Sequence, residues 1–210
     1  MLCTITRSRS LHVPLTGNSE EPKVSDIRGN PRLDYHRENR YISTMIDESQ
    51  HDRFMKTALA EAERAYELGE TPVGAVIVKN GSIIGRGGNR IETLHDPTAH
   101  AEILAIGAAC ETTGYERLVD SIMYVTLEPC VMYAGAIIQA RIPILFYGAA
   151  DPKAGACGSV LDICGSDKLN HTVQLTGGIM QEECAGILRH FFQQLRARNK
   201  QGGGFSPSLN

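Results

Sequence analysis

The spacing of hydrophobic residues changes along the chain, and the changes mark the secondary structure that we predict. From Phe54 to Tyr66 these residues recur every three or four positions, as on one face of an amphipathic helix, and Gly69 ends the pattern. Two short apolar runs, 75–78 and 83–84, then flank an Asn-Gly pair that favours a tight turn. This part of the chain therefore predicts a helix followed by a β-hairpin.

The same criteria predict the elements that follow. They are a helix at about 99–111, a strand at 123–127, a helix at 130–139, a strand at 144–147, a weak strand near 172–176 and a helix at about 181–198. Two strands joined by a short helix form a parallel pair with a right-handed crossover, whereas a hairpin is antiparallel. The order of elements therefore predicts a three-layer α/β/α domain with a mixed sheet of about five strands.

Composition divides the chain into three parts. Residues 1–50 combine arginine with Ser, Asn, Pro and Gly without lasting periodicity, which predicts a disordered extension. Residues 51–198 form the predicted folded domain, and 199–210 are a flexible tail rich in glycine and serine. Two other interpretations of residues 1–44 stay open: an organellar transit peptide, or a stretch upstream of a start at Met45.

The overall charge limits the kinds of partner that the chain can bind. A net charge of −3 excludes nucleic-acid binding by the whole surface, so any such contact needs a local basic patch. The only clear basic cluster is Arg189, His190, Arg196, Arg198 and Lys200. It either contacts RNA phosphates or is a solvated helix face. The neighbouring Phe191 and Phe192 either stack on bases or pack inside the protein or a dimer.

Cysteine usage and apolar runs bear on the location of the protein. The six cysteines lack the dense spacing of a secreted disulfide framework, so we expect them to be reduced. The N-terminus has no apolar region of the length that a signal peptide needs, and no run approaches the length of a membrane span. A cytoplasmic protein without membrane contact is therefore expected.

Chemistry-bearing residues stand at the starts of two predicted helices. His100 and Glu102 begin one helix, and Cys130 begins the next, directly after Pro129. Because each helix follows a strand, both N-termini should emerge at the same edge of the sheet, where sites gather. Imidazole and thiolate are zinc ligands, and a helix N-terminus favours the thiolate. In zinc nucleobase deaminases, the pattern H-x-E…P-C-x-x-C gives three ligands, and the glutamate transfers protons.

The strings around these residues make a family resemblance specific. Residues 51–197 resemble the bacterial-type tRNA-specific adenosine deaminases in register. The strings that carry the resemblance are Leu-His-Asp-Pro-Thr-Ala-His-Ala-Glu (94–102), Tyr-Val-Thr-Leu-Glu-Pro-Cys-Val-Met (124–132), Ala-Gly-Ala (134–136), Thr-Pro-Val-Gly-Ala-Val (71–76), Gly-Ala-Ala-Asp (148–151) and Glu-Cys-Ala (183–185). The resemblance implies a cytidine-deaminase-like fold, one zinc per subunit, a homodimer, and a hydrolase that converts the wobble adenosine of a tRNA anticodon arm to inosine.

The resemblance also implies roles for individual residues. His100 and Cys130 match zinc ligands, and Glu102 matches the general acid and base. Asn89 matches a residue that hydrogen-bonds the flipped base, although it has a second interpretation as a cap at the end of the hairpin. The residues expected to line the base pocket are Val73, Ala75 and Leu127.

One position departs from the family pattern, because Tyr133 stands where the second cysteine is expected. A phenol titrates near about 10, against about 8.5 for a thiol, and it is a larger group with a hard oxygen. Three outcomes stay open: weak zinc binding through His100, Cys130 and either water or Tyr133, substitution of the missing ligand by Cys157, or loss of the metal. The alternative functions are an impaired, metal-free binding subunit with the deaminase fold and a deaminase of free guanine or cytosine.

Overall fold

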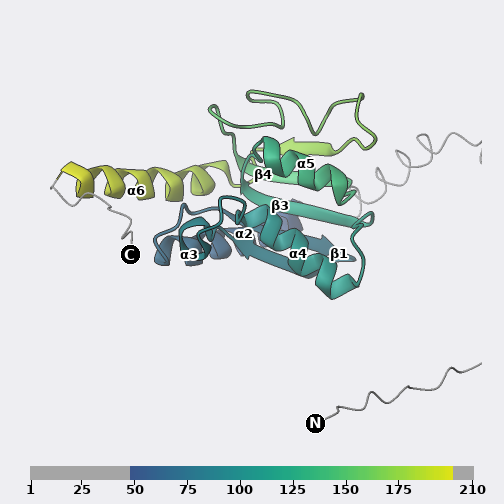
Figure 1. The fold of residues 1–210 in the computed structure, drawn as a ribbon, viewed down its shortest axis with the longest axis horizontal. Coiled ribbons are helices and arrows are strands. Elements are labelled where there is room, and N and C mark those ends of the chain that lie inside the picture. The colour runs from purple at the N-terminus through teal and green to yellow at the C-terminus, as the bar shows by residue number, and fades with distance from the viewer. Residues whose placement is uncertain (1–47, 201–210) are drawn as a thin grey trace, which may run out of the picture.

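Five strands form one mixed sheet in the order β2-β1-β3-β4-β5 (Figure 1). The computed structural model describes residues 48–200, so the predictions for residues 1–47 and 201–210 lie outside the described residues. The elements are α2 (Glu48–Glu67), β1 (Gly74–Lys79), β2 (Ser82–Gly88), α3 (Ile91–Leu94), α4 (Ala101–Thr113), β3 (Ser121–Leu127), α5 (Val131–Gln139), β4 (Ile144–Ala149), β5 (Gln174–Gly177) and α6 (Gln181–Lys200).

The directions of the strands confirm the predicted mixed sheet. β1 lies antiparallel to both β2 and β3, whereas β3, β4 and β5 run parallel to one another. The hairpin between β1 and β2 turns at Asn80 and Gly81, whose φ angles are 51° and 72°. Positive φ at both central residues is the reason that Asn-Gly is favoured in such a turn. The short helix α3 is the one element in the described chain that the hydrophobic pattern did not predict.

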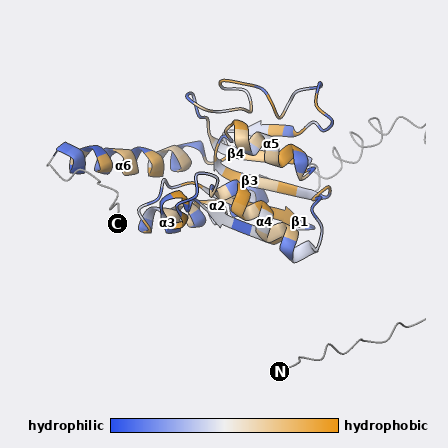
Figure 2. Ribbon diagram, in the orientation of Figure 1, coloured by the Kyte–Doolittle hydropathy of each residue, from blue (hydrophilic) through white to orange (hydrophobic). Residues whose placement is uncertain are grey.

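Helices cover both faces of the sheet, which gives the three predicted layers (Figure 1). Alternate residues of a strand point to opposite faces, so β1 contributes Ile77 to one core and Val76 to the other. The first core is closed by α4 and α5, and the second by α2 and the start of α6. Hydrophobic residues accordingly dominate the central strands, whereas the far end of α6 is hydrophilic (Figure 2).

Glycines in β2 allow the backbone of α4 to lie directly on the sheet. A Cβ atom at Gly87 would lie 2.3 Å from the carbonyl oxygen of Ala101, and one at Gly85 would lie 2.3 Å from that of Ala105. Any side chain there would push the helix away, because such distances are far below van der Waals contact. This close approach fixes the first turn of α4, where the His-x-Glu motif begins.

None of the helices between residues 48 and 200 combines the length and the apolar character that crossing a membrane requires.

Candidate active site

The two motif residues predicted as metal ligands are the N-cap residues of neighbouring helices. His100 occupies the N-cap position of α4, with φ −85° and ψ 163°. Cys130 occupies the N-cap position of α5, with φ −78° and ψ 176°. Both residues are extended, and neither side chain makes a capping hydrogen bond to its own helix. The imidazole and the thiol therefore stand at helix N-termini, where the helix dipole is positive.

The first turns of α4 and α5 contact each other through Tyr133. The rings of His100 and Tyr133 lie 4.4 Å apart, centroid to centroid, and Tyr133 is only 1% exposed. Burial raises the pKa of Tyr133, and the nearby charges of Glu102 and Cys130 raise it further. The structure thus brings together His100, Glu102, Cys130 and Tyr133, and it keeps the phenol neutral.

Glu102 is the buried acid of this group. It is 3% exposed, and burial raises its pKa to about 7. A carboxyl group with this pKa can release and accept a proton near neutral pH, as a general acid and base must. Burial also lowers the pKa of His100, which keeps the imidazole in the neutral form that binds metals.

The donors at this site do not fit a catalytic zinc ion, which takes three protein ligands and one water. Within residues 48–200, no group of three or more His, Cys, Asp or Glu side chains is arranged to hold a metal ion. His100 and Cys130 supply two donors, and the third position holds the neutral phenol of Tyr133. The structure does not support substitution by Cys157, because this thiol is buried, and its neighbour Cys164 together with burial raises its pKa.

Asn89 joins the end of the hairpin to the start of α4. Its Oδ1 atom accepts a hydrogen bond from the Ala101 N–H at 2.9 Å, and its own backbone N–H donates to the Val73 carbonyl at 3.1 Å. Asn89 is 3% exposed. Its side chain thus caps the helix that carries Glu102, a contact related to the second interpretation of this residue. Contact of Asn89 with a base stays a prediction.

The three residues predicted to line the base pocket differ in burial. Val73 and Ala75 belong to the core beneath α4 and α5, and Ala75 is completely buried. Leu127 is partly buried at the end of β3 and packs against both cores. Leu127 is therefore the member of the set with side-chain surface still accessible next to the Pro129-Cys130 segment.

Glu128 is a buried carboxylate that is not among the site residues predicted from the sequence. Its oxygens accept hydrogen bonds from the N–H groups of Asp151, Cys157 and Ser159, at 3.0, 3.0 and 3.1 Å, and from the Ser159 hydroxyl. Burial by itself would raise the pKa of Glu128, but these bonds lower it below the ordinary value. The carboxylate therefore holds the loop 151–159 in place.

The same loop contacts the segment that carries Cys130. The Ala156 N–H donates to the Pro129 carbonyl at 2.8 Å, and Gly155 pairs with Cys130 in an isolated β-bridge. A Cβ atom at Gly155 would lie 2.4 Å from the carboxyl carbon of Glu128, so glycine is required there. In the sequence, the feature that could have pointed to Glu128 is its position directly between a buried strand and Pro129-Cys130.

The predicted basic cluster lies on α6. Arg189 pairs with Glu182 at 3.2 Å, and the last turns of the helix are exposed. Phe191 packs on Tyr66 of α2 with ring centroids 5.8 Å apart, whereas Phe192 is 41% exposed. Phe191 therefore has a packing role inside the protein, as one of its two predicted interpretations held. The basic end of the helix is accessible to a partner.

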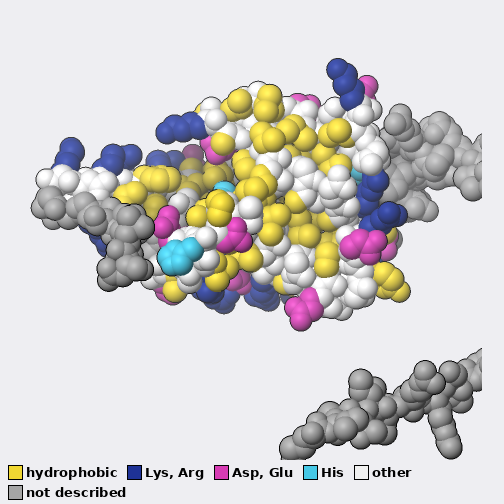
Figure 3. Space-filling view, viewed as in Figure 1, with side chains coloured by type: hydrophobic (Ala, Val, Ile, Leu, Met, Phe, Trp, Pro, Cys, Tyr) yellow, Lys and Arg dark blue, Asp and Glu magenta, His cyan; other side chains and the backbone are white. Residues whose placement is uncertain are grey.

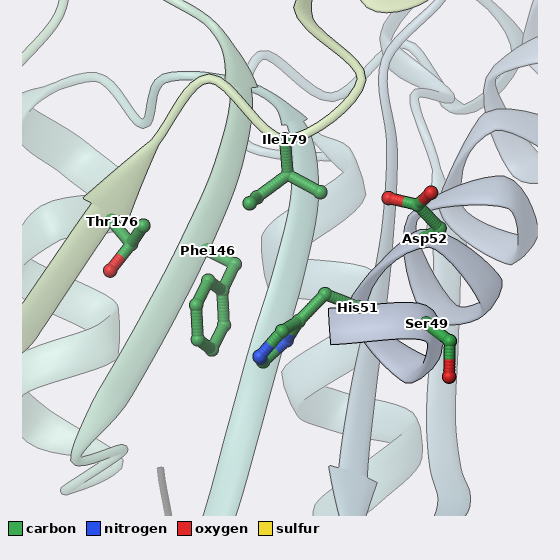
Figure 4. Close-up of a pocket in the computed structure, with 6 residues that line it drawn as sticks. All are labelled: Ser49, His51, Asp52, Phe146, Thr176 and Ile179. Atoms are coloured by element: carbon green, nitrogen blue, oxygen red, sulfur yellow. The ribbon is translucent and has the colours of Figure 1, made fainter. Parts of the chain in front are cut away.

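A separate cavity of about 580 Å³ lies on the α2 side of the sheet (Figure 4). Its lining residues are Ser49, His51, Asp52, Phe146, Thr176 and Ile179. The His51 ring lies 4.2 Å from the ring of Phe146, and its Nδ1 atom is hydrogen-bonded to the Tyr124 hydroxyl at 2.8 Å. Phe146 belongs to the core under α2, so this cavity is on the opposite face from α4 and α5.

An α/β/α domain with His-x-Glu and Pro-Cys at two adjoining helix N-termini defines the nucleobase-deaminase class. Residues 49–196 match the family model of the MafB19-like deaminases. The chain belongs to this family. The tRNA-specific adenosine deaminase of Bacillus subtilis (strain 168) is 43% identical over 152 residues, which cover 72% of this chain and 94% of that protein.

Two solved structures extend the comparison. One comes from a study of A-to-I editing by tRNA:A34 deaminases at the wobble position of transfer RNA. It shares 48% identity, has a TM-score of 0.63, and the match covers 65% of this chain and 99% of the other. A guanine deaminase from Nitrosomonas europaea is 21% identical with a TM-score of 0.60, over 67% of this chain and 83% of the other. At that identity the likeness shows the fold alone.

Proposed function

We propose that the chain acts on the anticodon arm of tRNA, at the adenosine in the wobble position, and that hydrolysis of adenosine to inosine is the chemistry of its site. In this reaction water supplies the new oxygen, the bond between C6 and the amino nitrogen breaks, and ammonia leaves. The 43% identity to a tRNA-specific adenosine deaminase over most of both chains supports the choice of substrate.

The observation that carries the proposal is the position of Glu102 beside the His100 and Cys130 helix starts. With a pKa near 7, its carboxyl group is suited to take a proton from water and to deliver one to the departing amino group. Asn89, whose side chain caps the start of the same helix, is proposed to hydrogen-bond the flipped base through its amide N–H, because its oxygen is already engaged by Ala101.

Zinc binding by this chain is supported only by its resemblance to the family. When bound in such a site, zinc lowers the pKa of its water to about 7 and so supplies the nucleophile. His100 and Cys130 are the residues of this chain that would hold it, but Tyr133 does not complete the ligand set. We therefore assign no catalytic step to the metal in this chain.

A second candidate function follows from Tyr133. A binding subunit that recognises the same adenosine without turnover would keep the fold, Glu102 and Asn89, and would dispense with the third ligand. A deaminase of free guanine or cytosine has weaker support, since the guanine deaminase likeness extends to the fold alone.

We also infer a homodimer in the cytoplasm. Large apolar side chains on the surface support the dimer, and hydrophobic groups are spread over the face on which α4 and α5 lie (Figure 3). Val131 and Met132, which directly follow Cys130, are 50% and 39% exposed. None of the described cysteines forms a disulfide, as is usual in a reducing compartment. Sedimentation of the purified chain tests the dimer.

The experiment that tests the function uses the full chain and an anticodon stem-loop with adenosine at the wobble position. Inosine is measured by mass spectrometry of the digested RNA, alongside bound zinc per chain, and Glu102→Gln is the inactive control. Binding that requires adenosine, with inosine formed in proportion to bound zinc, is the expected result. Activity on free guanine or cytosine without any binding to the stem-loop would overturn the proposal.

A further inference from the structure

Tyr133 and Glu102 each carry a buried polar atom without a partner. Within the described residues, neither the Tyr133 hydroxyl nor the Glu102 Oε2 atom makes a hydrogen bond. A buried polar group left unpaired destabilises the folded state, and each such group in a native structure needs an explanation. Two of them at one site indicate a place that a polar ligand fills.

The phenol of Tyr133 stands where a third metal ligand is needed. Residue 133 lies one helical turn after Cys130, so both side chains project from the same side of α5. The Tyr133 ring packs against the His100 imidazole instead of leaving the site, with centroids 4.4 Å apart. A phenol brings a hydroxyl proton where cysteine would bring a thiolate charge. The residue therefore removes a ligand and adds a hydrogen-bonding group.

We propose that Tyr133 converts the zinc position of this deaminase fold into a metal-free subsite, in which the Tyr133 hydroxyl and the Glu102 carboxyl group hold the edge of a purine base. The identity of that base, an adenine in RNA, rests on the proposed function. The adenine edge offers an acceptor at N1 and a donor at its amino group. A hydroxyl can donate and accept, and a carboxyl group can accept, so the two side chains match this edge. In this metal-free form the chain binds the anticodon adenosine without converting it, as in the second candidate function.

Three full-length proteins test the metal part of this proposal: the wild type, Tyr133→Cys and Tyr133→Phe. The phenylalanine variant is the matched control, because it keeps the ring, loses only the hydroxyl and adds no ligand. Each is purified with zinc and its bound zinc is measured by atomic emission, with thermal unfolding as the check on folding. The wild type and Tyr133→Phe are expected to hold little zinc, and Tyr133→Cys about one ion per chain.

The base-binding part is tested with anticodon stem-loops that carry adenine or an abasic site at the wobble position. Tyr133→Phe is expected to weaken adenine-dependent binding about tenfold, the effect of about one hydrogen bond, and to leave binding of the abasic RNA unchanged. Equal binding of the adenine stem-loop by wild type and Tyr133→Phe would overturn this part. One tightly bound zinc per wild-type chain would overturn the metal part without any variant.

Failure of the proposed function has a different signature. Zinc-loaded Tyr133→Cys that neither binds the stem-loop nor forms inosine would show that the RNA substrate is wrong, and would overturn the base-binding part as well. The zinc content of the wild type then still decides whether Tyr133 closes the metal position. Inosine formation by a zinc-loaded wild type would confirm the function and overturn the inference.

Discussion

The side-chain oxygen of Asn89 accepts a hydrogen bond from the Ala101 N–H at 2.9 Å, which ties the end of the hairpin to the first turn of α4. Because this N–H has no helical partner, Asn89→Ala leaves it unpaired and should lower the free energy of unfolding by about 1–2 kcal/mol. Urea unfolding monitored by circular dichroism measures the loss.

The variant Asn89→Asp separates this structural role from base binding. Aspartate keeps the oxygen that caps α4 but lacks the amide N–H, so it should retain most of the stability and still bind the adenine stem-loop more weakly. The same loss of stability in Asn89→Asp and Asn89→Ala would contradict the capping role. Unchanged RNA affinity in Asn89→Asp would contradict the contact with the base.

The buried carboxyl group of Glu102 makes the stability of the protein depend on pH. Its pKa rises from 4.5 in the unfolded chain to about 7 on folding, so the folded state binds the proton more tightly. Below about pH 4.5 the carboxyl group is protonated in both states and its ionisation costs no stability. As the pH rises from there to about 7, the free energy of unfolding falls, because the buried group resists ionisation. Glu102→Gln should be more stable than wild type at about pH 8, by on the order of 3 kcal/mol.

Urea unfolding at about pH 5 and about pH 8 tests this expectation. The gain from Glu102→Gln should be small at the lower pH and large at the higher one. The exposed Glu63→Gln on α2 is the matched control and should change stability equally at both. A gain from Glu102→Gln that does not depend on pH would show that the buried carboxyl group is paired in solution.

Glu128 should have the opposite pH dependence. Four hydrogen bonds from the loop 151–159 lower its pKa on folding. The stabilisation of the folded state by the ionised carboxylate is therefore complete above the unfolded pKa, and it is lost as the pH falls below about 4. Glu128→Gln should cost about 2–4 kcal/mol at neutral pH, since it removes the acceptor charge and weakens the bonds from the buried Cys157 N–H and from three half-buried donors.

Ser159→Ala is the graded control for Glu128, because it removes the hydroxyl and leaves the three backbone donors. It should cost about 1 kcal/mol. Hydrogen exchange at the Cys157 and Ser159 amides should accelerate strongly in Glu128→Gln and slightly in Ser159→Ala. Protection that is unchanged in Glu128→Gln would mean that the loop does not depend on this carboxylate.

The sequence predicted the parts of the fold that local pattern determines. Asn80-Gly81 specified the hairpin because only a few residue types accept positive φ at both positions, and the buried strand 123–127 was recognisable from its apolar run. The starts of α4 and α5 followed from the motif residues His100 and Cys130, which are the N-cap residues of these helices. These features depend on neighbours in the chain.

The features that the sequence did not reveal depend on contacts between distant segments. Glu128 accepts a hydrogen bond from the N–H of Asp151, which is 23 residues away in the sequence. This interaction requires the loop after β4 to return to the end of β3. The direction of the Tyr133 ring is set by packing on His100 from another helix. The position of Cys157 in the sequence made it a possible ligand. In the structure, the loop brings its thiol next to Cys164.

The basic end of α6 offers a test of RNA binding that does not involve the chemistry of the site. Arg196 and Arg198 are exposed on the last turns of the helix, where they can reach phosphates of a bound stem-loop. Each phosphate contact releases counterions, so Arg196→Gln with Arg198→Gln should weaken binding for adenine and abasic RNA alike. The slope of log affinity against log salt should also fall by about 1 per lost contact. Lys56→Gln, exposed on α2, is the charge-matched control, and the same loss of affinity and slope in both proteins would place the RNA elsewhere.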